Sequence, residues 1–256
     1  VQWGGGKGNL SATSYACTNL NGNYTIFSAS DGGSLLDLST ITSIDASRSS
    51  YTDLVYRVRA ANGGQVDLSG LTNVSGPTLE GHDRIEFIVE SSGILNLDSL
   101  ATTTSGSGKV RFDVRDTSGA PFALPALQAS DDAEFIVAAG LTVDLGTAGT
   151  PAVQSGGGYA LGDGAVVNYT PLTTLEWATM DLADGSEFNA PNLVDIDGTS
   201  ITLSPGRAFN TGVIGSLDNA RIAVTGGVQW GAGQGALSPT SYACTNLNGN
   251  YTIFSA

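Results

Sequence analysis

The chain has few charged residues and very few basic ones. Its 256 residues include 10 Lys and Arg against 24 Asp and Glu, which gives a formal net charge of −14 at pH 7. Only two of the basic residues are lysines, Lys7 and Lys109. Nucleic acids and anionic membranes are bound through clustered Lys and Arg, so we expect neither as a partner. An acidic surface instead favours solubility and the binding of cations.

Long apolar runs and helical periodicity are also missing. No stretch approaches the roughly 18 to 20 apolar residues of a membrane-spanning helix, so we expect no membrane span in this sequence. No charged segment followed by an apolar one precedes the first residues, so an export signal or anchor is expected to lie outside the sequence. Disorder is excluded by a hydrophobic content of 41%, because the apolar residues recur at regular intervals.

Motifs of the common enzyme classes are absent as well. The sequence contains no HExxH, CxxC, P-loop or GxSxG pattern, and its single histidine, His82, has no partners of a catalytic triad. Three acidic pairs are the candidates for cutting a polysaccharide: Asp131 with Asp132, Asp181 with Asp184, and Asp195 with Asp197. Scattered acids in turns are usually solvated, whereas a catalytic pair needs a defined separation across a groove. We therefore expect no enzymatic activity and keep a polysaccharide-active β-helix as the third hypothesis.

The most informative feature of the chain is a repeat of its beginning at its end. Residues Val1 to Ala29 and Val228 to Ala256 are identical at 25 of 29 positions, with an offset of 227 residues. This indicates a tandem array in which residues 1–227 form one unit and residues 228–256 begin the next. We expect further copies of the unit to follow end to end as its partners.

A second and shorter period divides the long unit. A hydrophobic residue, then Asp or Asn, then a small or hydrophobic residue recurs, usually with Leu or Ile three residues later. The copies are Leu36-Asp37-Leu38, Val66-Asp67-Leu68, Leu95-Asn96-Leu97, Phe122-Ala123-Leu124, Val143-Asp144-Leu145, Val167-Asn168-Tyr169, Phe188-Asn189-Ala190, Phe209-Asn210-Thr211 and the degenerate Trp230-Gly231-Ala232. Nine copies average about 25 residues each, which is typical of solenoids.

Most copies carry a second alternating run, such as Tyr56-Arg57-Val58-Arg59 or Val110-Arg111-Phe112-Asp113-Val114. Short alternation bounded by Gly, Ser, Asn and Asp predicts strands. Two or three short strands per copy can close one coil of a parallel β-solenoid (β-helix), and the connection rule for parallel strands favours a right-handed coil. The sequence therefore predicts an all-β fold with about nine coils per 227-residue unit, with a β-sandwich or propeller as the alternative.

Two segments resemble a known type of repeat. GGQVDLSGLTNVSG (Gly63 to Gly76) and SGILNLDSLATTTSG (Ser92 to Gly106) are similar to the beta strand repeat segments of very long bacterial surface proteins and adhesins. The resemblance implies secretion, an all-β rod, and a role as a surface fibre or adhesin. It brings no catalytic residues to this chain.

The polar middle residue of each first strand is the candidate metal ligand. Alternation places these residues on the outer face, where they form a column along the coils. The residues proposed for a Ca²⁺ column are Asp37, Asp67, Asn96 and Asp144. Ca²⁺ needs six to eight oxygen ligands, and one carboxylate per coil supplies few. The alternative is a ladder of side chains that hydrogen-bond to one another or cap turns.

The duplicated block contains the cysteines and a concentration of aromatic residues. Cys17 and Cys244 occupy equivalent positions, as do Trp3 and Trp230. One interpretation is a buried thiol and aromatic residues that fill the core. The other is a lateral contact between neighbouring chains, with the thiol forming a crosslink in an oxidising compartment.

Taken together, these patterns predict a structural component of an extracellular filament or cell-surface fibre. The second hypothesis is an adhesin that binds a surface glycan or protein through its longer loops, Asp45 to Asp53 and Gly76 to Asp83. An ice-binding solenoid is a fourth and weaker one, because the threonines do not recur at matched positions.

Overall fold

The computed structural model describes residues 8–9, 12–18, 20, 22–47, 53–78, 82–147, 149–226, 230, 236–237 and 254–255. Throughout this part of the chain the elements are strands joined by turns, and no helix occurs. No helix long and apolar enough to span a membrane is therefore found among the described residues. The chain divides into two compact units, Val1–Ile136 and Val137–Ala256. The two units are described in turn.

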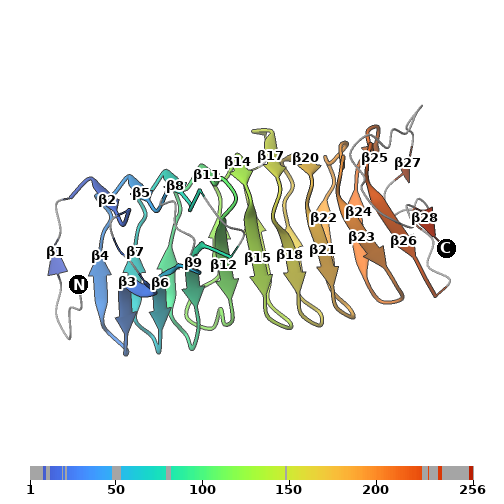
Figure 1. Ribbon diagram of the computed structural model, residues 1–256. Coiled ribbons are helices and arrows are strands. Elements are labelled where there is room, and N and C mark those ends of the chain that lie inside the picture. The colour runs from blue at the N-terminus through green and yellow to red at the C-terminus, as the bar shows by residue number, and fades with distance from the viewer. Residues whose placement is uncertain are drawn as a thin grey trace. The chain divides into compact units, whose positions relative to one another are not determined.

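In the first unit the strands come in successive triplets, and each triplet adds one strand to each of three walls (Figure 1). The first wall contains β1 (Gly8–Asn9), β4 (Leu35–Asp37), β7 (Gln65–Asp67) and β10 (Ile94–Asn96), and β13 (Phe122–Leu124) opens the fifth triplet. The second contains β2 (Ser14–Ala16), β5 (Ser43–Asp45), β8 (Asn73–Ser75), β11 (Thr102–Thr104) and β14 (Ala129–Asp131). The third contains β3 (Tyr24–Ser30), β6 (Val55–Ala61), β9 (Arg84–Val89), β12 (Lys109–Val114) and β15 (Ala133–Val137).

The second unit repeats this arrangement with shorter connections. Its first wall contains β16 (Thr142–Leu145), β19 (Val166–Asn168), β22 (Glu187–Ala190) and β24 (Ala208–Thr211). The second contains β17 (Ala152–Ser155) and β20 (Leu172–Glu176), continued by single bridges at Asp195 and Ser216. A separate two-stranded sheet is formed by β25 (Val213–Ile214) and β27 (Ala236–Leu237). The third contains β18 (Gly158–Leu161), β21 (Thr179–Leu182), β23 (Ser200–Leu203), β26 (Arg221–Val224) and β28 (Phe254–Ser255).

Neighbouring strands of each wall pair in parallel and in register. Leu36 pairs with Val66, and Val66 pairs with Leu95, so the apolar residues of the short repeat lie directly above one another. All three side chains are buried, whereas the neighbouring Asp37 and Asp67 are only half-buried. The predicted all-β fold with parallel, stacked strands is confirmed as a β-solenoid-like arrangement in each unit, and the predicted alternation is confirmed in these strands.

The core is formed by columns of identical or similar side chains. In the first unit, Phe112 stacks between Phe87 and Phe135, with ring centroids 5.4 and 5.0 Å apart. In the second unit, Phe188 and Phe209 stack at 5.4 Å. All of these rings are completely buried. Each coil therefore covers the apolar face of the next. This burial of apolar surface and the close contacts between the rings stabilise the fold.

Glycine at the start of a coil serves two different purposes. A Cβ atom at Gly93 would lie 2.2 Å from the carbonyl oxygen of Ala60, so this glycine allows close contact between coils. Gly164 has open space around it, but its φ of +66° lies in the left-handed region that side chains disfavour. The two glycines occupy different places in the repeat, since Gly93 lies two residues before the buried Leu95 and Gly164 lies three residues before the buried Val167.

The phenylalanine stack provides a test of this core. We expect Phe112→Ala to lower the free energy of unfolding by about 3 to 5 kcal/mol, because it removes the central ring of the column and leaves a cavity. Urea unfolding followed by circular dichroism measures the change. Tyr24→Ala, at a side chain that is 42% exposed, serves as the control and should alter stability by less than about 0.5 kcal/mol. Equal losses in both variants would contradict the assignment of the core.

Candidate functional surfaces

The proposed calcium column of the first unit contains Asp37, Asp67 and Asn96, which lie in register on β4, β7 and β10. Each side chain is already engaged with its own turn. The Asp37 carboxylate accepts bonds from the Ser39 hydroxyl (2.6 Å) and the Ser39 amide (3.1 Å), and these bonds lower the pKa of Asp37. Asp67 and Asn96 accept equivalent amide bonds from the residues two positions later, both at 3.0 Å.

Asp144 belongs to a different column in the second unit, where it meets asparagines from successive coils. Asn168 donates to Asp144 (2.8 Å), Asn189 donates to Asn168 (3.0 Å), and Asn210 donates to Asn189 (2.6 Å). The two alternatives to calcium, turn capping and a hydrogen-bonded ladder, are therefore both present, one in each unit. No group of three or more His, Cys, Asp and Glu side chains that could hold a metal ion is found in the described part of the chain. A calcium column stays a prediction.

Within the duplicated block, Cys17 has a buried thiol. The side chain is 1% exposed, and its sulfur donates to the carbonyl oxygen of Asp45 at 3.5 Å. Burial raises the pKa of Cys17 to about 12, and the charge of Asp45 adds to the increase. A buried and protonated thiol is unreactive, which favours the interpretation of a packed cysteine over a crosslink at this position.

The aromatic residues of the block that can be described also pack into the protein. Tyr15 contacts Phe27 with ring centroids 4.7 Å apart, and Trp230 packs edge-on against the core residue Phe209 at 5.9 Å. Cys244 and Trp3 lie outside the described residues. The lateral contact predicted for these residues is untested.

The neighbouring strands β6, β9, β12 and β15 of the first unit (Figure 1) carry a surface that the sequence analysis did not predict. Six of the ten basic residues of the chain meet four carboxylates here, and we call this group the charged face. The cations are Arg57, Arg59, Arg84, Lys109, Arg111 and Arg115; the carboxylates are Glu86, Glu90, Asp113 and Glu134. Cations that are far apart in sequence are therefore close together in the fold.

Strand register explains this network. Arg57, Glu86 and Arg111 are direct partners in adjacent strands, so that charges of alternating sign lie about 4.8 Å apart. Glu86 accepts from Arg57 (3.0 Å), Arg84 (2.5 Å) and Arg111 (3.3 Å). Glu134 accepts from Lys109 and Arg111, and Glu90 accepts from Arg59 and Arg115.

Burial and pairing act in opposite directions on these carboxylates. Desolvation alone would raise the pKa of Glu86, but the hydrogen bond from Arg84 and the charges of Arg84, Arg57 and Arg111 outweigh it and lower that pKa. The same balance lowers the pKa values of Glu90 and Glu134. The cations of the charged face thus favour the ionised forms of Glu86, Glu90 and Glu134.

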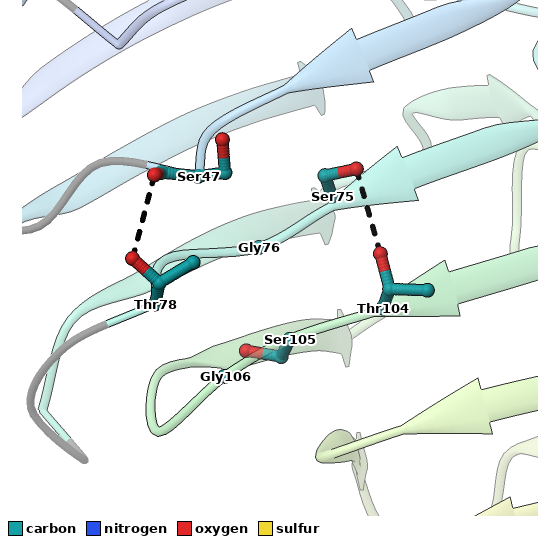
Figure 2. Close-up of a pocket in the computed structure, with 7 residues that line it drawn as sticks. All are labelled: Ser47, Ser75, Gly76, Thr78, Thr104, Ser105 and Gly106. Carbon is teal, nitrogen blue, oxygen red and sulfur yellow. Dashed lines mark hydrogen bonds between the residues drawn. The ribbon is translucent and has the colours of Figure 1, made fainter.

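A pocket lined by hydroxyl groups opens at the ends of β5, β8 and β11 (Figure 2). Its volume is about 240 Å³, and it is lined by Ser47, Ser75, Gly76, Thr78, Thr104, Ser105 and Gly106. Thr78 donates to the carbonyl oxygen of Ser47, and Thr104 donates to the hydroxyl of Ser75, both at 3.4 Å. Ser47 and Thr78 belong to the two loops predicted to hold an adhesin's ligand, of which residues 48–52 and 79–81 lie outside the described part of the chain.

The acidic pairs proposed for catalysis lie in three separate places. Asp131 ends β14 next to Asp132, and Asp181 is exposed on β21, three residues before Asp184 in the following turn. Asp195 and Asp197 are both half-buried in the second wall of the second unit. Asp197 accepts from the Ser216 hydroxyl (2.7 Å) and the Asp218 amide (2.6 Å).

The environment of Asp195 is unusually acidic. Burial raises the pKa of Asp195, and the nearby charges of Asp197 and Glu176 raise it further. The exposed indole of Trp177 lies against Gly198 of the adjacent coil, the residue that follows Asp197. His82, the remaining candidate, offers its backbone carbonyl to Arg84 (3.1 Å).

Comparisons with protein-family models, with curated proteins and with solved structures find no match to this chain.

The charged face predicts a dependence of stability on pH. Because the folded-state pKa values of Glu86, Glu90 and Glu134 lie below those of the unfolded chain, their stabilisation is present above the unfolded value of about 4.3 and is lost as the pH falls through the folded values. We expect the free energy of unfolding to be constant from about pH 7 to 5 and to fall at more acidic pH.

Urea unfolding at several pH values measures this dependence. Glu86→Gln should lose roughly 3 kcal/mol at pH 7, because it leaves three guanidinium groups around a neutral side chain, and should show a weaker loss in acid. Glu187→Gln, at an exposed carboxylate of the second unit, is the control. Identical pH profiles for the two variants would contradict the role of Glu86.

Proposed function

We propose that the protein is a structural component of an extracellular filament or cell-surface fibre built from tandem β-solenoid units. In this proposal, residues 1–227 form one unit of about nine right-handed coils and residues 228–256 begin the next. The resemblance of Gly63–Gly76 and Ser92–Gly106 to the repeats of bacterial surface proteins and adhesins supports the extracellular location. Each unit would add roughly 43 Å to the filament at the spacing of parallel strands.

The observation that carries this proposal is the pairing of the second copy of the duplicated block. In the second unit, β28 pairs in parallel with β26, with Phe254 opposite Ile222. Phe254 corresponds to Phe27 at the 227-residue offset, and Phe27 lies in β3 of the same wall. β27, which corresponds to Asn9 and Leu10 at the same offset, pairs in parallel with β25 in a separate two-stranded sheet. The start of a following unit can therefore continue the third wall of the preceding unit.

The continuous pairing of short strands suits a load-bearing role. Each wall is bonded from strand to strand by backbone groups, for example Leu38 N to Asp67 O (2.8 Å) and Leu68 N to Asn96 O (3.0 Å). Such bonds run from coil to coil, along the direction in which coils are added, and no single coil can unfold without breaking the bonds on both sides. We expect a unit of this construction to resist bending and extension.

An adhesin is the second candidate, and the pocket of Figure 2 favours it. The pocket joins both predicted ligand loops and offers hydroxyl groups suited to a polar ligand such as a surface glycan. Its volume of about 240 Å³ is below the 300 to 1,000 Å³ that is usual for ligand sites, and no aromatic ring lines it. Because of these two features, we place the adhesin hypothesis second to the structural role.

Electron microscopy of the full-length native protein tests the filament proposal. We expect unbranched filaments whose power spectra contain an axial reflection at about 4.7 to 4.8 Å, produced by stacked strands. Isolated globular particles, or filaments without that reflection, would show that the proposal is wrong.

Glycan arrays test the adhesin alternative. If the pocket binds a glycan, Thr104→Val should reduce binding at least tenfold, because it removes a hydroxyl from the lining and leaves the shape unchanged. Thr142→Val, at an exposed threonine of the second unit, is the matched control. Equal binding by both variants, or no binding by the wild type, would remove the pocket as a ligand site.

A further inference from the structure

The charged face presents its cations to solvent and covers its acids. The side chains of Arg59 and Arg115 are 37% and 51% exposed, whereas that of Glu86 is 7% exposed. Six cations also outnumber four carboxylates here. The outer layer of this sheet face is therefore electropositive.

The remainder of the chain has the opposite charge. Apart from the charged face, the sequence contains four basic residues and twenty acidic ones. The charge of the chain is thus strongly divided between one basic surface and acidic surroundings. Such a division provides electrostatic complementarity between two copies of the same chain.

An ordered acidic surface lies in the second unit. The bridges from Thr174 to Asp195 and from Asp195 to Ser216 place Glu176, Asp197 and Asp218 at equivalent positions of successive coils. Backbone bonds from Trp177 to Asp197 (2.8 Å) and from Gly198 to Asp218 (2.7 Å) fix the same register. The three carboxylates and the neighbouring Asp195 form what we call the acidic column.

Trp177 makes this column a fitting partner for arginine. Its side chain is 45% exposed although tryptophan is usually buried, and its φ is +56°. The ring lies against Gly198, where an added Cβ would approach it to 2.4 Å. A fixed indole beside carboxylates offers guanidinium groups both ion pairs and cation–π contacts, and Trp and Arg are the residues enriched in protein interfaces.

We propose that copies of the chain associate laterally, with the charged face of one copy against the acidic column and Trp177 of another. Arg57 and Arg111 of the charged face are two coils apart, and so are Glu176 and Asp218 of the acidic column, so that two cations can face two carboxylates across the contact. The contact deepens the proposed function, on which it rests, because it would join filaments side by side.

The net charge of −14 per chain does not prevent this contact at physiological salt. At an ionic strength of about 0.15 M the Debye length is about 8 Å, so distant charges are screened while groups in contact still attract. At about 1 M salt the attraction between exposed groups is screened as well. Each tandem unit carries both surfaces, so two arrays would be joined by one contact per unit. The overall binding would then be stronger than that of a single weak contact.

Sedimentation of the 256-residue chain and two of its variants tests the proposal. We expect the wild type to self-associate at about 0.15 M salt and to be monomeric at about 1 M. Arg59→Glu with Arg115→Glu gives the chain two acidic surfaces. Glu176→Lys with Asp197→Lys and Asp218→Lys gives it two basic ones, because the three lysines outnumber Asp195. Each variant should associate at least tenfold more weakly than the wild type, and an equimolar mixture of the two should recover association, because every contact is again between opposite charges.

Asp163→Lys with Asp181→Lys and Glu187→Lys is the matched control, since it makes the same charge change at exposed acids outside the acidic column. It should associate at least as strongly as the wild type. Trp177→Ala should weaken association, while Tyr24→Ala should not. Circular dichroism confirms folding, and if the double arginine variant is unfolded, Arg115→Glu alone replaces it and retains the bond between Arg59 and Glu90.

Three results would overturn the proposal: a wild type that is monomeric up to about 1 mM, a mixture that does not recover association, or a wild type that binds a sulfated polysaccharide without associating with itself. Unbundled single filaments in electron micrographs of the native protein would also overturn the lateral contact while leaving the filament proposal intact. Globular particles without filaments, by contrast, would contradict the filament proposal itself.

Discussion

Every strand in this protein depends on the strands of neighbouring coils for its backbone hydrogen bonds. A strand of three residues such as β7 has no partner within its own coil, and its peptide groups are satisfied only by β4 on one side and β10 on the other. The coils must therefore follow the same path in the same register. A residue in one coil is then placed directly above its equivalent in the next, and each position of the repeat becomes a column through the unit.

The chemistry of each column follows from that placement. Phenylalanines such as Phe188 and Phe209 can stack on one another, and asparagines such as Asn168 and Asn189 can donate and accept in a chain. Identical charges would repel at the same spacing, and on the charged face the register instead alternates Arg57, Glu86 and Arg111. Glu176, Asp197 and Asp218 are a column of like charge, which is why this place stands out as a surface that a partner of opposite charge would stabilise.

The strands that could be predicted from sequence are those whose own residues alternate visibly between apolar and polar. The first strands show a buried, polar, buried pattern, as in Leu36-Asp37-Leu38, and β6 and β12 alternate over six or seven residues. The residue bounds of the second-wall strands β5, β8 and β11 were not predicted. Each of these strands buries a single side chain between polar neighbours, and these side chains are Ile44, Val74 and Thr103. One inward residue per strand is too few to show a period, and in β11 that residue is the polar Thr103.

The charged face was missed for a related reason. Its partners are separated by 29 residues between Arg57 and Glu86 but by 25 between Glu86 and Arg111, so no fixed spacing reveals them. The cations looked too sparse to form a cluster, and only the register brings them together. The candidate ligands Asp37 and Asp67 were placed correctly on a common outer column, yet the turn bonds that occupy them depend on Ser39 and Ser69, residues outside the repeated triplet.

The dependence of each coil on its neighbours also explains why a repeated unit suits this architecture. A stack of parallel strands ends in an edge of unpaired N–H and C=O groups, which invites uncontrolled pairing unless something covers it. In the second unit, β28 pairs with the edge of β26, and its residues repeat those of β3. A following unit would therefore cover the edge left by the preceding one with a strand that is already matched to it. Each added unit covers the edge of the one before it, and the contact uses the same strand pairing that already joins the coils within a unit. This favours extension by tandem repetition over closure into a separate domain.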